Sequence, residues 1–205
     1  MPVIIDYGVG NLFSLTSSFK FIGEDVTVTS DKKKIAEADK LILPGVGAFE
    51  DAAKALRETG MYDVVKEEAK KGKPLLGICL GMQMLLSKSY EYGEHEGLDL
   101  IPGNVKPIAP VIGEGLKVPH IGWNALIFPE DKPKSKLYKY VNPGEHVYFV
   151  HSYYGADCDK YVSAYSEYGA YLTASVEFEN VYGTQFHPEK SGKTGLNILK
   201  AFCEL

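Results

Sequence analysis

The chain has 205 residues and a formal net charge of −5 at pH 7. This length is enough for one well-buried core, so we expect a single domain over residues 1–205. The negative charge gives no general basic field, which argues against nucleic acid as a partner. No apolar stretch approaches the length of a membrane span, so we expect no membrane association. Three cysteines with no paired spacing indicate a reducing compartment, and we expect a cytoplasmic protein.

The first half of the chain alternates short apolar runs with amphipathic segments. The runs predict strands over Val3–Asp6, Val26–Thr29 and Lys40–Leu43. The segments between and after them predict helices over Leu12–Ile22, Ile35–Ala38, Ala52–Glu58 and Tyr62–Lys71. Such alternation is typical of an α/β fold with an open, mostly parallel central sheet flanked by helices.

No nucleotide or metal site is predicted. Gly8-Val9-Gly10 follows the first expected strand, but the third glycine of a dinucleotide-binding motif would fall on Phe13. Asn11 is explained more simply as the cap of the following helix. The five histidines form no metal-binding spacing with one another or with cysteine. We therefore assign neither a metal nor any other cofactor.

A glycine-containing turn, Pro44-Gly45-Val46-Gly47, follows the Lys40–Leu43 strand. It lies at the sheet edge where open α/β proteins bind ligands. Gly45 allows either sign of φ, so the peptide that follows it can present its N–H or its C=O. The N–H of Val46 or Gly47 is thus a candidate for an oxyanion hole, although a plain strand-to-helix turn would use the same glycines.

The segment Gly77-Ile78-Cys79-Leu80-Gly81 lies between the apolar run Pro74–Leu76 and the amphipathic stretch Met82–Leu86. This pattern predicts a strand, a one-residue turn and a helix, which is the arrangement of a nucleophile elbow. N–H groups and the helix dipole stabilise a thiolate at such a position. Cys79 is therefore a candidate nucleophile, and the N–H of Leu80 a second oxyanion donor. The alternative is a buried structural cysteine.

The second half of the chain indicates more β structure. Residues 93–159 are richer in glycine, proline and aromatic residues, and we expect loops and a smaller antiparallel β region there. The strands and the final helix expected here are Val147–Val150, Tyr161–Tyr165, Tyr171–Glu177, a strand starting at Val181, and a helix over Asn197–Leu205.

His187-Pro188-Glu189 follows the strand that starts at Val181. A thiolate nucleophile needs a base, and the base needs a group that holds its orientation. Cys79, His187 and Glu189 would supply these three roles. A histidine before a proline is by itself a weak signal, since such a residue often binds backbone in a loop. Two motifs that each follow a strand strengthen the prediction.

Several aromatic residues of the middle region have two explanations. His120 and His151 are expected to be structural or interface residues, because a histidine among apolar neighbours is usually hydrogen-bonded within the fold. Trp123 and Tyr148 suit an interface, where aromatic residues are enriched, or the core.

In these motifs the chain resembles the class I (triad-type) glutamine amidotransferases, with Cys79, His187 and Glu189 in the family's triad order. The resemblance covers nearly the whole chain and implies the family's flavodoxin-like architecture. It also implies a glutamine site. Gln83 would hold the carboxylate or the amino end of the substrate and Glu91 its α-amino group, and the pocket would be completed by Ser152 and Tyr153.

Within this family, four segments resemble the glutaminase subunits of imidazole glycerol phosphate synthases: Asp6–Asn11, Pro44–Phe49, His120–Asn124 and Tyr148–Tyr153. That resemblance implies hydrolysis of L-glutamine through a cysteine thioester. It also implies a heterodimer with a (β/α)₈-barrel cyclase subunit, which receives the ammonia in histidine biosynthesis. The alternatives are a glutaminase of another pathway, a related intracellular cysteine hydrolase, or a non-catalytic binding subunit. The intact set of three residues argues against the last.

Overall fold

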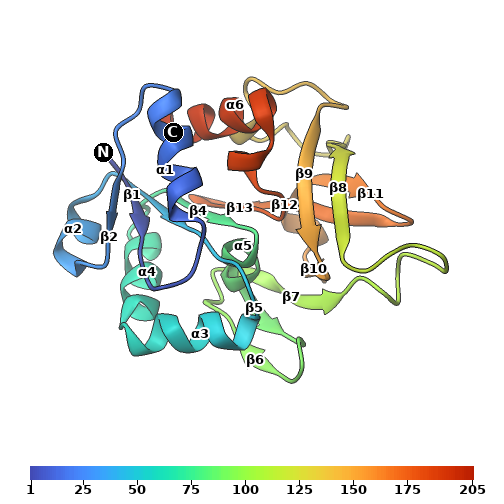
Figure 1. The fold of residues 1–205 in the computed structure, drawn as a ribbon, viewed down its shortest axis with the longest axis horizontal. Helices are drawn as coiled ribbons and strands as arrows, with labels where there is room; N and C mark the ends of the chain where they lie inside the picture. The colour runs from blue at the N-terminus through green and yellow to red at the C-terminus, as the bar shows by residue number, and fades with distance from the viewer.

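The computed structural model describes residues 1–205, and a seven-stranded sheet crosses its centre (Figure 1). Five adjacent strands are parallel: β13 (Val181–Thr184), β4 (Leu75–Ile78), β3 (Lys40–Leu43), β1 (Pro2–Ile5) and β2 (Thr27–Thr29). At one edge, β12 (Tyr171–Phe178) and β11 (Val162–Glu167) continue the sheet in antiparallel orientation. The predicted open, mostly parallel sheet is confirmed. None of the helices combines the length and apolar character needed to cross a bilayer.

Both faces of the central strands are buried. In β1, Val3 and Ile5 belong to one hydrophobic cluster and Ile4 to a second, because successive side chains of a strand point to opposite faces. In β3, Leu41 and Ile42 divide between the two clusters in the same way. Burial on two sides explains why these strands are continuous apolar runs and do not alternate with polar residues.

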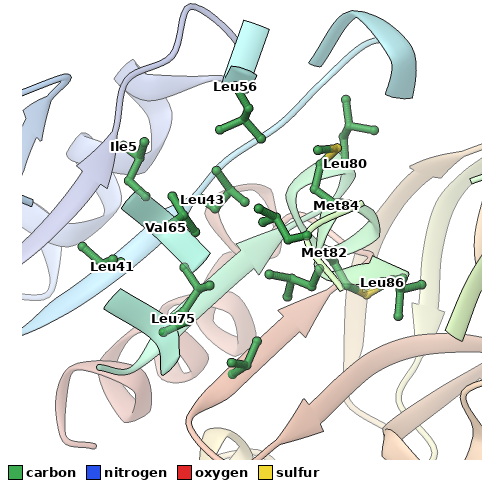
Figure 2. Close-up of a cluster of buried hydrophobic side chains, with 14 of the residues drawn as sticks. Ile5, Leu41, Leu43, Leu56, Val65, Leu75, Leu80, Met82, Met84 and Leu86 are labelled. Carbon is green, nitrogen blue, oxygen red and sulfur yellow. The ribbon is translucent and has the colours of Figure 1, made fainter. Parts of the chain in front are cut away.

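Helices cover both faces of the sheet. One face packs against α2 (Lys32–Glu37), α3 (Phe49–Glu58), α4 (Met61–Lys70) and α5 (Leu80–Leu85). Figure 2 shows this cluster, where the strand residues Leu41, Leu43 and Leu75 lie around Val65 of α4, and Leu56 of α3 belongs to the same cluster. The other face packs against α1 (Leu12–Phe21) and α6 (Gly192–Cys203), which lie together above the sheet in Figure 1. Each fully buried aliphatic side chain contributes about 1.5–3 kcal/mol.

Two smaller sheets lie beyond α5. One contains β10 (Tyr153–Ala156), β7 (Ile101–Pro107), β5 (Leu86–Ser89) and β6 (His95–Glu96), and the other β8 (His120–Ala125) and β9 (His146–His151). Their pairs are antiparallel except for β5 and β7, which are parallel. The expected antiparallel region is present. However, Leu86 was predicted to end a helix, and it begins β5 instead.

Three helices begin at least three residues earlier than predicted. Helix α2 begins at Lys32, before the predicted Ile35, because the Asp31 side chain caps it by accepting from the N–H groups of Lys33 and Lys34. Helix α3 begins at Phe49, before the predicted Ala52, because the carboxylate of Glu91 accepts a hydrogen bond from the Phe49 N–H at 2.7 Å. Helix α6 begins at Gly192, before the predicted Asn197. Here Gly195 packs so closely that a Cβ would lie 1.9 Å from the Pro188 carbonyl oxygen. The start of α3 thus depends on a contact outside the helix itself.

Candidate active site

Cys79 is the single residue between β4 and α5, as the elbow motif predicted. Its φ of 55° and ψ of −111° are unusual for a residue other than glycine, and such a conformation costs on the order of 1–3 kcal/mol. Two backbone hydrogen bonds hold it. The Cys79 N–H donates to the Thr184 carbonyl at 2.7 Å, and the Cys79 carbonyl accepts from the Gln83 N–H at 3.2 Å. The turn is therefore fixed by both the strand and the helix.

The glycines around the elbow are required by close packing. A Cβ on Gly81 would lie 1.9 Å from the Leu43 carbonyl oxygen, and one on Gly77 would lie 2.6 Å from the Gly81 carbonyl oxygen. A Cβ on Gly45 would lie 2.8 Å from the Gly81 nitrogen. The elbow, strand β3 and the turn after β3 thus approach one another more closely than any side chain allows.

His187 and Glu189 form a buried pair beside the elbow. Nδ1 of His187 lies 2.8 Å from Oε1 of Glu189, and the two side chains are 3% and 1% exposed. The backbone N–H of His187 donates to the Tyr148 carbonyl of β9 at 3.0 Å, and the Ser191 hydroxyl donates to the backbone carbonyl of His187 at 2.6 Å. Because β13 and β4 are adjacent parallel strands, the segment that follows β13 lies next to Cys79.

The electrostatics of His187 link it to both partners. Burial lowers the pKa of His187, but hydrogen bonds to Cys79 and Glu189, together with the negative charges of these two groups, raise it by more. The net result raises the pKa to about 9. Since Nδ1 faces Glu189, Nε2 is the nitrogen left for Cys79. The raised pKa therefore favours a protonated imidazole between Cys79 and Glu189.

A cleft of about 330 Å³ opens in front of Cys79. It brings together nine of the predicted site residues: Val46, Gly47, Cys79, Leu80, Gln83, Glu91, Ser152, Tyr153 and His187. Glu189 does not line this cleft and lies behind His187. The other lining residues are Pro119, Val150, His151 and Lys190, which were not predicted as site residues. The volume is within the range of small-molecule sites.

Gln83 and Glu91 are held in place by partners distant in sequence. Nε2 of Gln83 donates to the Tyr153 carbonyl at 3.1 Å and to Oε1 of Gln185 at 3.0 Å. The oxygen of this amide is thus left to accept a hydrogen bond, which favours the amino end of a substrate over its carboxylate. Oε2 of Glu91 binds the Phe49 N–H, so the carboxylate is anchored where it lines the cleft.

The predicted oxyanion donors line the same cleft as Cys79. Leu80 is the first residue of α5, and N–H groups at that position have no partner within the helix. Val46 and Gly47 line the cleft after β3. The sequence indicated conformational freedom at Gly45, but the positive φ occurs at Gly47, where it is 93°. Gly45 is needed for close approach to α5 instead.

Two residues near Cys79, Tyr7 and Gln185, were not identified as site residues from the sequence. The buried Tyr7 hydroxyl donates to the Pro44 carbonyl at 2.7 Å, and burial, with the negative charge of Cys79, raises the pKa of Tyr7. Nε2 of Gln185 lies 3.8 Å from Sγ of Cys79. Tyr7 follows β1 at the same sheet edge as Pro44, which is the signal that would have identified it.

His120 and His151 were expected to be either structural or interface residues, and their burial favours the structural role. His120 and His151 are buried and bind each other through ring nitrogens 3.1 Å apart. Burial, as the largest effect, lowers the pKa of His151 to about 4. Trp123 is 53% exposed on β8 and packs edge-on against Tyr148, so it does not belong to the core.

Comparison with known proteins identifies the family of this chain. The family model for glutamine amidotransferase class-I matches residues 3–204, and the chain belongs to that family. Its relatives include the imidazole glycerol phosphate synthase subunit HisH of Carboxydothermus hydrogenoformans, 49% identical with all of both chains covered. The same subunit of Caldanaerobacter subterraneus is 49% identical, with 98% of this chain and 97% of the relative covered. The motifs indicated a resemblance to the class I glutamine amidotransferases and, within them, to the glutaminase subunits of imidazole glycerol phosphate synthases. Both resemblances are confirmed.

Solved structures share the fold. A glutamine amidotransferase crystal structure superposes with a TM-score of 0.75 at 20% identity, covering 98% of this chain and 97% of the other. The structure of PurLQS from Thermotoga maritima gives a TM-score of 0.70, also at 20% identity, with coverage of 99% and 97%.

Proposed function

We propose that this chain is the glutaminase subunit of an imidazole glycerol phosphate synthase and that Cys79, His187 and Glu189 are its catalytic residues. The observation that carries the proposal is the His187 imidazole, which binds a buried carboxylate through Nδ1 and whose pKa is raised in part by the elbow cysteine Cys79. The names of the full-length relatives support the choice of enzyme within the family.

In the first half of the reaction, Sγ of Cys79 attacks the carboxamide carbon of glutamine. The negative charge that develops on the carboxamide oxygen is stabilised by the N–H of Leu80 together with that of Val46 or Gly47. The substrate's α-ammonium group is held by the oxygen of Gln83 and the carboxylate of Glu91. We assign Ser152 and Tyr153 to the rest of the glutamine pocket because they line the same cleft.

His187 moves the protons. Nε2 of His187 donates a proton to the leaving nitrogen, so ammonia departs and a thioester to Cys79 remains. His187 then takes a proton from water, which attacks the thioester and releases glutamate. Glu189 holds the imidazole by its Nδ1 throughout and stabilises its charged form.

The ammonia must reach an acceptor without becoming ammonium, because ammonium is not a nucleophile. We propose that a (β/α)₈-barrel cyclase subunit binds this chain in a heterodimer and uses the ammonia to make imidazole glycerol phosphate and aminoimidazole carboxamide ribotide. We also propose that the chain forms one domain, because its two large core clusters share one sheet. Its three free cysteines favour the cytoplasm.

A glutaminase assay with the purified heterodimer tests the proposal. Cys79→Ser should abolish glutamate formation while leaving the far-ultraviolet circular dichroism and subunit binding unchanged, because a hydroxyl is not ionised by the same base. A chloroketone analogue of glutamine should label Cys79 in preference to Cys158 and Cys203. Full turnover by Cys79→Ser would exclude the thiolate mechanism, and equal labelling of all three thiols would remove the case for an activated Cys79.

A further inference from the structure

Gln185 lies between the end of β13 and His187, and its side chain is fully buried. Its backbone N–H donates to the Ala174 carbonyl at 2.8 Å, which continues the pairing of β13 with β12. The side chain bonds to two cleft residues. Oε1 accepts from Nε2 of Gln83 at 3.0 Å, and Nε2 lies 3.8 Å from Sγ of Cys79. One buried amide therefore connects the elbow cysteine with a residue of the glutamine pocket.

The direction of this chain of hydrogen bonds is fixed by a backbone group. The Tyr153 carbonyl can only accept, so the nitrogen of the Gln83 amide must face it at 3.1 Å. The same nitrogen donates to Gln185, which must therefore present its oxygen to Gln83. The nitrogen of Gln185 is then the atom that faces Cys79. The orientation of both amides follows from Tyr153 and does not depend on their individual assignment.

An N–H donor aimed at a sulfur atom acts differently on a thiol and on a thiolate. Hydrogen bonds to an ionised acceptor are about twice as strong as those between neutral groups. The Gln185 amide therefore favours the charged form of Cys79. An amide with a purely structural role would also be satisfied by hydrogen bonds, but its removal would not change the ionisation of Cys79.

We propose that Gln185 is a positioning residue for glutamine hydrolysis, whose amide holds the Cys79 sulfur as a thiolate and orients Gln83 toward the substrate. This inference rests on the proposed function, in which Cys79 is the nucleophile. His187 and Tyr7 also interact with Cys79. The charged or titratable residues elsewhere around the cleft are Glu91, His151, Tyr153 and Lys190, and all of these remain in the variants below.

Alkylation of the full-length chain by iodoacetamide tests the effect on Cys79 without glutamine. The rate at Cys79 is followed against pH by mass spectrometry for wild type, Gln185→Leu and Gln185→Glu. Gln185→Leu should raise the pH of half-maximal rate by about one unit, the equivalent of losing one hydrogen bond to a charged group. Gln185→Glu keeps the size of the side chain and the hydrogen bond that Gln83 donates to it. This variant should raise the pH of half-maximal rate at least as far, because a carboxylate then faces the sulfur.

Matched controls separate this role from a general loss of stability. Asn180→Leu removes another amide, which donates to the carbonyls of Ala69 and Lys73 near the opposite end of β13, and should leave the Cys79 profile unchanged. Cys158, measured in the same samples, should also keep its profile. An unmoved Cys79 profile in folded Gln185 variants would overturn the proposal, as would an equal shift in Asn180→Leu.

Two further measurements complete the test. In the heterodimer, Gln185→Leu should lower kcat about tenfold and also raise the KM for glutamine, because both Cys79 and Gln83 lose a partner. Should the variants not fold, the Gln185 side-chain amide resonance of the wild type should move with pH at the Cys79 alkylation midpoint, and should not do so in Cys79→Ala. A resonance that behaves identically in both proteins would refute the contact. Absence of glutaminase activity in the wild-type heterodimer would instead refute the proposed function.

Discussion

Nδ1 of His187 donates to Oε1 of Glu189 across 2.8 Å, and the second carboxylate oxygen of Glu189 has no hydrogen-bond partner within the chain. A buried carboxylate is costly unless a positive charge or several hydrogen bonds compensate it. His187 is its partner here, and the pKa of His187 is raised accordingly. The charged form of His187 is therefore stabilised in part by Glu189.

Glu189→Gln should reduce kcat for glutamine at least about a hundredfold, because the amide keeps the shape of the side chain but not its charge. The pKa of His187 should fall from about 9, since one of the groups that raise it is lost. The assay is glutamate formation by the heterodimer against pH. Glu204→Gln removes a carboxylate from a surface pair with Lys139 and should leave kcat unchanged. Equal kcat values for Glu189→Gln and wild type would exclude the orienting role.

Gly81→Ala should destabilise the chain by roughly 3 kcal/mol, because the added methyl group would overlap the Leu43 carbonyl oxygen. Urea unfolding gives the change in free energy. Gly72→Ala is the matched control. Gly72 has a φ of 90° and open space around it, so the cost should be only about 1 kcal/mol from backbone strain. If the two variants lost the same stability, close packing would not be the reason for a glycine at position 81.

The parts of the site that the sequence predicted are those whose geometry is local. The elbow is encoded by glycines within two residues of Cys79, and His187 and Glu189 are two residues apart. Alternating apolar runs similarly indicated the parallel sheet, because strands buried on both faces carry few polar residues.

The contacts that were missed join segments distant in sequence. Glu91 caps α3 through Phe49, 42 positions away, and no pattern near Phe49 indicates that partner. Gln185 meets Gln83 across 102 positions. The parallel pairing of β5 with β7 depends in the same way on how α5 ends, since Leu86 leaves the helix directly into a strand. Such features follow from the assembled fold and not from any single segment.

Glu68→Gln should lower stability at pH 7 by about 1 kcal/mol. Glu68 is buried on α4 and lies 2.6 Å from Nζ of Lys71 and 2.7 Å from Nζ of Lys73, and these hydrogen bonds lower its pKa. A carboxyl group with a lowered pKa stabilises the folded state above its ordinary pKa of 4.5, and this contribution is lost as the pH falls further. The difference between the two proteins should therefore disappear in acid.

Urea unfolding at a series of pH values between 7 and acid measures this difference. Glu67→Gln changes an exposed neighbour on the same helix and should have little effect at any pH. A difference between Glu68→Gln and wild type that stayed constant as the pH fell would show that the loss comes from packing and not from the charge of Glu68.

Cys79→Ala in the heterodimer should abolish product formation from glutamine but retain it from added ammonium salts. In the proposed function, the substitution removes the nucleophile that releases ammonia, whereas the acceptor chemistry resides on the partner subunit. The rate with ammonium salts should rise with pH, because free ammonia is the reactant and its fraction increases. Wild-type heterodimer with the same salts is the control, and gel filtration checks that the variant still assembles. Loss of both reactions in an assembled complex would place Cys79 in the synthase chemistry itself, which is incompatible with its role as an ammonia donor.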